Sequence, residues 1–269
     1  MKKLSVWMSM LLMFSLLLAA CGGSDENDNA SGDEGNKDYK LVEDGKFTFA
    51  SSGEFKPFSY ADPDDPTKMV GYDIAVANAI AEELGLEPSP QKYKFASIIA
   101  GVKGDRFDAA VASHTITDER AKEVDFTEPY YYSGPQIFVR PDSDIETAED
   151  LKGKDVAVSK GSTYAKMAVK YTDNIKTFDS DVVALQALSE GKNDAVITDF
   201  ITGQLAIKSG FEIVAKERLG ESEQAIAISK ENPELLKAVN EALQKLKDNG
   251  TLAKLSKEWI GEDITTSEK

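Results

Sequence analysis

Short apolar segments alternate with amphipathic segments between residues 45 and 265, and this alternation restricts the fold more than any other feature of the chain. KFTFASS and FDAAVAS have the composition of buried strands, whereas GYDIAVANAIAEELGL repeats its apolar residues with helical spacing. A further strand is predicted over KYKF, residues 92–95. Strands that alternate with helices predict an α/β fold with mostly parallel sheets.

A weak internal repeat predicts two lobes of similar architecture. Residues 104–113 (GDRFDAAVAS) and 191–200 (GKNDAVITDF) each contain a glycine, a short turn, an Asp-Ala pair and an apolar strand. Ligands of open α/β sheets bind beyond the carboxyl ends of the strands. The residues that directly follow these two strands are therefore candidate ligand-binding residues.

The residues after the two strands carry complementary charges. Ser113, Thr115 and Arg120 follow the first strand, and Asp199 follows the second. An arginine with hydroxyl donors suits a carboxylate, and a carboxylate suits an ammonium group, so facing lobes would complement a zwitterion. Two alternatives remain: Arg120 as a solvated helix residue behind an N-cap at Thr117, and Asp199 as the N-cap of a helix over 200–210.

The N-terminus predicts export and a lipid anchor. Residues 1–20 have a positive start and an apolar run, as in a signal peptide, and LAAC resembles a lipobox in which Cys21 is lipidated. A plain signal peptide or a short membrane helix is the alternative. Residues 21–44 are acidic and almost free of apolar side chains, which predicts a disordered tether.

Composition excludes several classes of function. The formal net charge of −16 disfavours nucleic acid and anionic lipid head groups as partners. The single cysteine leaves no disulfide for the folded part. Neither a P-loop nor a metal-ligand motif occurs in the sequence, so no cofactor is expected.

Three separated motifs carry a family resemblance. They are GYDIAVANAIAEELG at 71–85, TITDERAKEVDFTEPYY at 115–131 and GTLAKLSKEWIGED at 250–263. The chain resembles family 3 extracellular solute-binding proteins, the polar-amino-acid receptors of ABC importers, except at Ala75, where an acidic residue is usual.

The resemblance implies the two-lobed periplasmic-binding-protein type II fold, in which each lobe is a mostly parallel sheet flanked by helices and two hinge strands join the lobes. It implies the following division of the chain: lobe 1 at 45–132 and 224–265, lobe 2 at 133–223, and a polar tail at 266–269.

The resemblance also implies roles for individual residues. Three would hold the ligand carboxylate: Arg120, Thr115 and the backbone of Thr163. Two would hold the ammonium: Asp199 and the carbonyl of Ser113. Phe55 and Phe95 would sandwich the ligand side chain, with core packing as their alternative. His114 is expected behind the site, because strand alternation points it away from Ser113.

The residues expected around the ligand side chain are small or uncharged: Ser52, Ser159, Thr198 and Tyr164. Relatives that bind basic side chains or glutamine often have an aspartate at the position of Ser52, and the glutamine type has a lysine and a histidine at the positions of Ser159 and Thr198. The sequence therefore predicts an uncharged polar or sulfur-containing ligand, cystine-like or glutamine-like.

The function predicted is capture of an L-amino acid at the outer face of the membrane and its delivery to an ABC permease, which is driven by a partner ATPase. A stand-alone sensor of the same fold is the first alternative. A dehydratase-type enzyme is the second, with Glu54 as the acid near the expected cleft. The chain is predicted not to be an enzyme.

Overall fold

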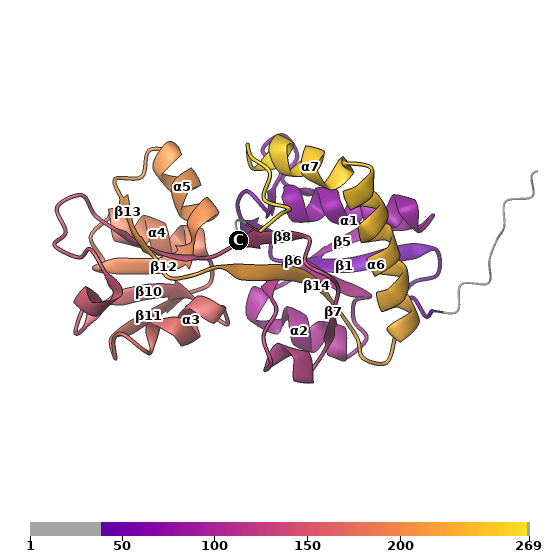
Figure 1. Ribbon diagram of the computed structural model, residues 1–269, viewed down its shortest axis with the longest axis horizontal. Helices are drawn as coiled ribbons and strands as arrows, with labels where there is room; N and C mark the ends of the chain where they lie inside the picture. The colour runs from indigo at the N-terminus through magenta and orange to yellow at the C-terminus, as the bar shows by residue number, and fades with distance from the viewer. Residues whose placement is uncertain (1–38, 268–269) are drawn as a thin grey trace, which may run out of the picture. The chain divides into compact units, whose positions relative to one another are not determined.

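The computed structural model describes residues 39–267, which form two α/β lobes (Figure 1). The predicted signal peptide, Cys21 and most of the predicted tether lie outside the described residues. We call the sheet that contains the first strand, with its helices, lobe 1, and the other sheet, with its helices, lobe 2. In residues 39–267, every helix is too short or too polar to span a bilayer.

Lobe 1 is built on a six-stranded sheet with the order β5-β1-β6-β14-β7, and β8 pairs with β14. Its strands are β1 (Lys46–Ser51), β5 (Glu87–Lys92), β6 (Ala109–Thr115), β7 (Asp125–Phe126), β8 (Tyr131–Ser133) and β14 (Ser222–Ile228). β1 runs parallel to β5 and β6, whereas β14 is antiparallel to β6. Three short strands form a separate small sheet: β2 (Glu54–Phe55), β3 (Ser59–Ala61) and β4 (Met69–Val70).

Lobe 2 is built on a five-stranded sheet with the order β11-β10-β12-β9-β13. Its strands are β9 (Pro135–Val139), β10 (Val156–Ser159), β11 (Ile175–Phe178), β12 (Ala195–Asp199) and β13 (Val214–Arg218). β10, β11 and β12 are parallel, so the carboxyl ends of β10 and β12 lie at the same edge. β9 and β13 are antiparallel to their neighbours.

Helices cover both faces of each sheet, which explains why the central strands β1, β6, β10 and β12 are buried along most of their length. The helices are α1 (Tyr72–Glu83), α2 (Phe95–Lys103), α6 (Pro233–Asp248) and α7 (Thr251–Trp259) in lobe 1, and α3 (Thr163–Ala168), α4 (Asp181–Ser189) and α5 (Phe200–Lys208) in lobe 2. Two 3-10 turns are η1 (Arg120–Lys122) and η2 (Ala148–Leu151). Along β1, Phe49 packs in the core under α1 and Ala50 packs in the core under α2, as strand alternation requires.

The chain passes between the lobes twice at the hinge, between β8 and β9 and between β13 and β14. The two crossings lie backbone against backbone, since a Cβ atom on Gly134 would be 2.2 Å from the carbonyl oxygen of Gly220. Only glycine fits at Gly134. The two-lobed fold is confirmed, while the lobe boundaries expected at 133 and 223 stay a prediction.

The strand predicted over residues 92–95 is wrong. The strand is β5, five residues earlier, and Phe95 begins α2. β5 contains Pro88 and Pro90, which hid it from a pattern reading. The strand tolerates both prolines because of its hydrogen-bond pattern. The N–H groups of Glu87 and Tyr93 donate to the β1 side, to the carbonyls of Gly45 and Ser51. The backbone nitrogens of the even-numbered residues, including both prolines, therefore point to the open edge of the sheet, where no N–H is required.

The last residues of the predicted tether are ordered against lobe 1. Tyr39 and Leu41 pack partly buried against its core. The N–H of Val42 donates to Asp108 at 2.7 Å, and Asn232 donates to the carbonyl of Lys40 at 2.8 Å. Within the described residues, the chain therefore packs on lobe 1 from Tyr39 onward, ahead of the predicted start of lobe 1 at residue 45.

Candidate functional site

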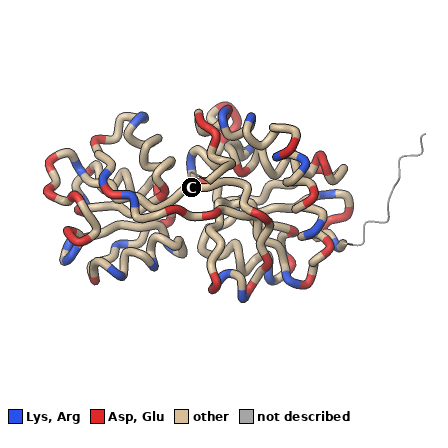
Figure 2. Tube along the Cα trace, in the orientation of Figure 1, with Lys and Arg blue, Asp and Glu red and all other residues tan. Residues whose placement is uncertain are grey.

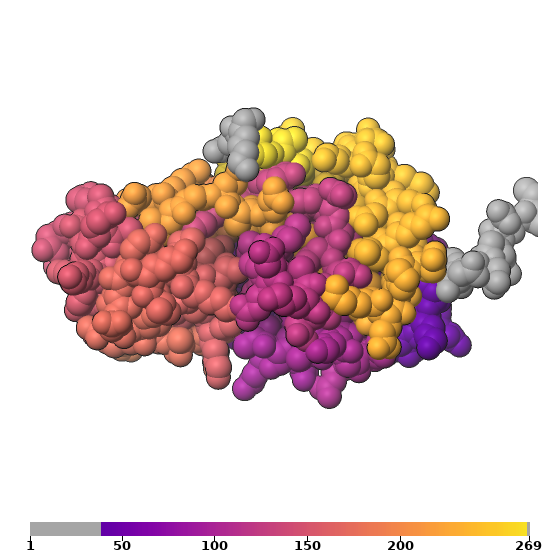
Figure 3. Space-filling view, turned by 60° about the horizontal axis from the view of Figure 1, so that its bottom comes forward, coloured from indigo at the N-terminus to yellow at the C-terminus, as the bar shows by residue number. Residues whose placement is uncertain are grey.

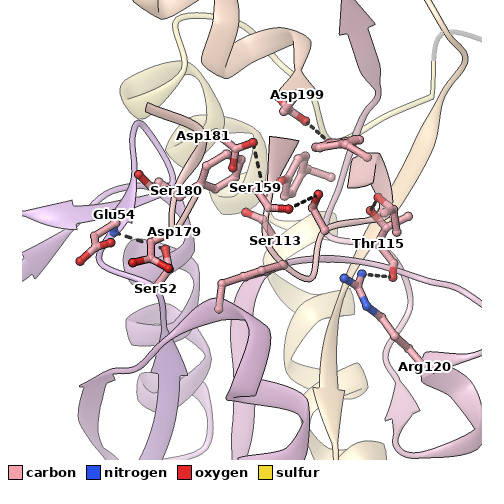
Figure 4. Close-up of a pocket in the computed structure, with 16 residues that line it drawn as sticks. Ser52, Glu54, Ser113, Thr115, Arg120, Ser159, Asp179, Ser180, Asp181 and Asp199 are labelled. Carbon is pink, nitrogen blue, oxygen red and sulfur yellow. Dashed lines mark hydrogen bonds between the residues drawn. The ribbon is translucent and has the colours of Figure 1, made fainter. Parts of the chain in front are cut away.

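A pocket lies between the lobes and encloses about 520 Å³ of empty space, part of it open to solvent. Lobe 1 lines it with Ser52, Glu54, Phe55, Phe95, Ser113, Thr115, Arg120 and Tyr131. Lobe 2 lines it with Ser159, Ser162, Thr163, Tyr164, Asp179, Ser180, Asp181 and Asp199. The two lobes touch along their boundary on the face drawn in Figure 3. Every residue that was predicted to contact the ligand, except Thr198, therefore lines this pocket (Figure 4).

Arg120 reaches from lobe 1 to lobe 2. Its Nη1 donates to the carbonyl of Thr115 at 2.8 Å, and its Nη2 donates to the carbonyl of Gly161 at 3.2 Å. Its backbone N–H donates to Thr117 Oγ1, so the capping alternative describes its backbone correctly. Burial lowers the pKa of the Arg120 guanidinium, which still carries its charge at neutral pH. A directed, partly desolvated cation in a pocket suits a carboxylate.

Thr163 stands opposite Thr115 at the same end of the pocket. It is the first residue of α3, and its Oγ1 lies 3.5 Å from Thr115 Oγ1. Ser162 caps α3 by accepting from the N–H of Ala165. Gly161, just before it, has a positive φ of 80° and leaves so little room that an added Cβ would lie 2.9 Å from Ala96 of lobe 1. The backbones of the two lobes lie close together there.

Asp199 caps a helix, as the alternative from the sequence states, and it also lines the pocket. Its Oδ1 caps α5 by accepting from the N–H of Ile201 at 2.9 Å. Its Oδ2 accepts from Ser133 at 2.6 Å and from Tyr164 at 3.2 Å. Asp199 is buried and lines the pocket, and burial raises its pKa to about 6. A buried carboxylate without a cation beside it in the described part of the chain suits a cationic ligand group.

Ser113 is held in an unusual conformation by a buried acid that the sequence analysis did not single out. Its φ is 56°, a left-handed value that is rare for residues with a side chain. Ser113 Oγ donates to Asp73 Oδ2 at 2.9 Å, and Tyr130 Oη donates to Asp73 Oδ1 at 2.5 Å. The N–H of Ser113 donates to Tyr130 Oη at 3.0 Å. Asp73 thus fixes the direction of Ser113 from behind.

The two predicted aromatic residues line the pocket and are backed by other rings. Phe55 stacks on Phe58 with centroids 4.9 Å apart, and Phe95 stacks on His114 with centroids 4.7 Å apart. His114 is buried behind Phe95, as strand alternation predicts. Burial, and secondly the charge of Arg120, hold the pKa of His114 well below its usual range. His114 is therefore a neutral support for Phe95.

The prediction that Thr198 borders the pocket is wrong. Thr198 is fully buried, and its Oγ1 donates to Asp181 Oδ1 at 2.6 Å. Ser159 lines the pocket, yet its hydroxyl donates to the same oxygen at 3.0 Å. The two hydroxyls that were expected to face a neutral ligand instead support a carboxylate. Sequence reasoning missed Asp181, although its position at the start of a helix, beyond a strand, is a detectable signal.

The other end of the pocket carries further acids. In Figure 4, Glu54, Asp179 and Ser52 lie on the side away from Arg120. Glu54 is exposed and pairs with Lys92 at 2.9 Å, and Ser52 Oγ lies 3.2 Å from Ser59 Oγ. Between residues 39 and 267, no group of three or more His, Cys, Asp or Glu side chains is arranged to hold a metal ion.

Comparison with known proteins identifies the family. The sequence profile of the bacterial extracellular solute-binding proteins, family 3, matches residues 47–262. The chain belongs to this family. The L-cystine-binding protein TcyJ of Escherichia coli (strain K12) is 34% identical to this family 3 protein over 232 residues, 84% of this chain and 86% of TcyJ.

Two further comparisons agree in fold and sequence. The ABC transporter glutamine-binding protein GlnH of Bacillus subtilis (strain 168) is 31% identical over 272 residues, 98% of this chain and 99% of GlnH. The solved structure of an ancestral arginine-binding protein bound to arginine matches with a TM-score of 0.77 and 34% identity, covering 81% of this chain and 99% of that one. Extracellular solute-binding proteins act outside the cytoplasm.

Proposed function

We propose that this family 3 solute-binding protein captures an L-amino acid between its lobes and delivers it to the permease of an ABC importer. The observation that carries this proposal is that Arg120 of lobe 1 and Asp199 of lobe 2 line the same pocket. A partly buried cation and a buried carboxylate across one cavity complement the two charges that all α-amino acids share. The names of the cystine-, glutamine- and arginine-binding relatives agree with it.

Each end of the ligand has a set of partners in this proposal. The carboxylate accepts hydrogen bonds from Arg120, Thr115 and the backbone N–H of Thr163. The ammonium donates to Asp199 and to the carbonyl of Ser113. Phe55 and Phe95 cover the ligand side chain. Charge-assisted hydrogen bonds of roughly 1.5–3 kcal/mol each suffice for the ~8 kcal/mol of a micromolar site after the cost of association.

The proposal includes closure of the lobes over the ligand. Its support is that Arg120 and the carbonyl of Gly161 belong to different lobes and already contact each other. An exposed ion pair between Glu119 and Lys166 also crosses between the lobes. We divide the chain for this motion into lobe 1 (residues 39–133 and 222–267) and lobe 2 (residues 135–218), with the hinge between them.

A thermal-shift screen against the common L-amino acids tests the proposal. A ligand that binds the folded state raises the melting temperature in proportion to its occupancy. Arg120→Ala and Asp199→Ala should each abolish the shift. The matched control is Arg106→Ala, because Arg106 is an exposed arginine that donates to Tyr93 away from the pocket. If no amino acid shifts the melting temperature while another solute does, the zwitterion site is wrong.

We also propose that the protein is bound to the outer face of the membrane through a lipid on Cys21. The lipobox-like LAAC and the acidic stretch that follows support this proposal. The protein should fractionate with membranes and incorporate labelled palmitate, whereas Cys21→Ala should appear in the medium without label. Membrane association of Cys21→Ala would contradict the anchor.

The protein is proposed to bind its ligand without converting it. Glu54, the acid considered for catalysis, is exposed and paired with Lys92 at the mouth of the pocket. General acid or base catalysis requires a group held against the reacting atoms with a pKa suited to the task. Recovery of the ligand unchanged after long incubation is expected, and appearance of a product would overturn this part of the proposal.

A further inference from the structure

Asp181 gives the pocket a buried carboxylate that the backbone of an amino acid does not use. It is 8% exposed and lines the pocket from the first turn of α4. Thr198 and Ser159 both donate to its Oδ1, so one carboxylate oxygen is anchored to the ends of β12 and β10. Its position is therefore fixed by two adjacent strands and a helix.

The charges around the pocket do not balance for a ligand with a neutral side chain. Four carboxylates line it, those of Glu54, Asp179, Asp181 and Asp199, against the single guanidinium of Arg120. The carboxylate and ammonium of an α-amino acid account for Arg120 and Asp199. Glu54 is paired with Lys92. Asp179 and Asp181 remain, and in residues 39–267 neither has a lysine or arginine within ion-pair distance.

The unbalanced acids lie where the ligand side chain must extend. Figure 4 shows Arg120 and Thr115 on one side of the pocket, with Asp181, Asp179 and Glu54 on the other. A ligand whose carboxylate is bound by Arg120 therefore directs its side chain toward these acids. Figure 2 shows acidic and basic residues interspersed along the chain in both lobes.

We propose that the pocket selects amino acids whose side chain ends in a second cationic group, and that Asp181 is the residue that determines this specificity. The proposal rests on the proposed function, because it assumes that Arg120 and Asp199 hold the backbone of the ligand. The second cation is the distal ammonium of a diamino compound such as cystine, or the guanidinium or ammonium of a basic side chain. Asp179, at the exposed end, adds to the attraction.

This inference changes the ligand class that the sequence alone predicts: it keeps a cystine-like ligand, disfavours a glutamine-like ligand and adds basic side chains. Ser52 argues against a basic ligand only if the carboxylate that pairs with the ligand side chain has to come from that position. In this chain the acid comes from the opposite lobe, on α4. A neutral side chain would leave the Asp181 carboxylate buried without a cation, which costs affinity because a desolvated charge is unfavourable unless it is paired. A second cation on the ligand supplies the missing charge.

Matched ligands test the proposal on the unaltered protein by calorimetry. Each pair contrasts a ligand that has a distal cationic group with an analogue that lacks it: arginine and citrulline, lysine and norleucine, cystine and mono-N-acetylcystine. At least one charged member should bind about tenfold or more tightly than its neutral partner, the size expected for one charge-assisted contact. The pair that binds distinguishes a diamino disulfide from a basic side chain.

Asp181→Asn tests the residue. It keeps the shape of the side chain and one carbonyl oxygen for the hydroxyls, and removes the charge. The preference for the charged member should fall about tenfold, with little change in the affinity for its neutral partner. The control is Asp108→Asn, which removes a carboxylate that is equally buried in lobe 1 but lies off the pocket. Asp108→Asn should keep the preference.

The outcomes separate this inference from the proposed function. If neutral and charged partners bind equally, or if glutamine binds best, the second-cation site is wrong while the amino-acid site stands. If no amino acid binds, both fail. Should Asp181→Asn not fold, Asp179→Asn provides the second test, since Asp179 is exposed, and it should lower the preference by a smaller factor. An unchanged preference in both variants would overturn the proposal.

Discussion

Asp73 on α1 accepts a hydrogen bond from Ser113 Oγ at 2.9 Å while the backbone of Ser113 is held at a φ of 56°. The two residues are 40 positions apart in the sequence. The contact pins the carboxyl end of β6, from which the pocket residues Ser113 and Thr115 project. The left-handed backbone of Ser113 is thus stabilised by a side chain that does not itself line the pocket.

At Ser113, a glycine substitution should give a more stable protein than an alanine substitution, the reverse of the usual order. Both substitutions remove the bond to Asp73, but glycine also relieves the left-handed backbone strain of about 1–2 kcal/mol. Since glycine costs only about 0.5–1 kcal/mol through the unfolded chain, Ser113→Gly should be the more stable variant in urea unfolding. At Ser97 in α2, the same pair should show the ordinary order, with alanine more stable. Greater stability of Ser113→Ala would contradict the strain at Ser113.

Gly161→Ala should weaken ligand binding by hindering closure of the lobes. Its Cβ would lie 2.9 Å from Ala96 Cβ and 3.0 Å from Ala96 Cα, closer than side chains tolerate. Calorimetry should show an affinity loss of about tenfold or more, equivalent to ~1.4 kcal/mol.

Gly153→Ala is the matched control for Gly161→Ala. Gly153 is in the same lobe at a φ of 76°, against 80° for Gly161, and has nothing within 4 Å of its added Cβ. It carries the same backbone strain without the contact to lobe 1. Equal affinities of the two variants would show that strain, and not close approach, explains the effect.

Ligand affinity should fall on acidification through pH 6. Burial raises the pKa of Asp199 to about 6, so below that pH the carboxyl must lose a proton before it can pair with an ammonium. The dissociation constant should rise by up to about tenfold per pH unit below 6. Calorimetry at pH 6 in two buffers of different ionisation enthalpy should detect release of a proton on binding. A constant affinity from pH 5 to 8, with no proton released, would contradict this role of Asp199.

The free energy of unfolding of the wild-type protein should fall relative to that of Asp73→Asn as the pH rises from 4 to 8. Burial raises the pKa of Asp73 to about 7 from 3.8, so the folded state holds a proton that the unfolded state has lost. The contribution to stability is therefore fully present below about pH 4 and is lost progressively as the pH rises through 7, in total by roughly 4 kcal/mol. Urea unfolding of both proteins from pH 4 to 8 checks this. His114, whose pKa is also shifted, is present in both proteins, so its contribution cancels in the difference between their free energies of unfolding. A difference that does not change with pH would exclude the titration of Asp73.

The alternation of strands and helices was predictable because it depends on local periodicity. The sequence could also predict that Ser113, Thr115, Arg120 and Asp199 lie near one cleft, since they lie at or shortly after the carboxyl ends of two strands. β5 was missed because its prolines are acceptable only at an open edge, and the position of a strand within a sheet is a tertiary property.

Asp73 and Asp181 were missed for a different reason. Each reads as an ordinary acid in the first turn of a helix, where a carboxylate is common. Their importance arises from hydroxyl groups that the fold brings from distant strands, such as Thr198 for Asp181. Thr198 was expected in the pocket because glutamine-type relatives have a histidine at its position. Neighbouring residues on a strand point to opposite faces, and on β12 it is Asp199 that lines the pocket.

The prolines of β5 protect the protein from association with its own copies. β5 is the outer strand of the lobe 1 sheet, and its free side presents the backbone of Pro88 and Pro90. An unpaired strand edge is a template for another chain, because its N–H and C=O groups can extend the sheet. At these two positions the edge has no N–H to offer, so a second molecule cannot continue the hydrogen-bond ladder. The sheet of lobe 1 can thereby keep an open edge without extending into a second molecule at these positions.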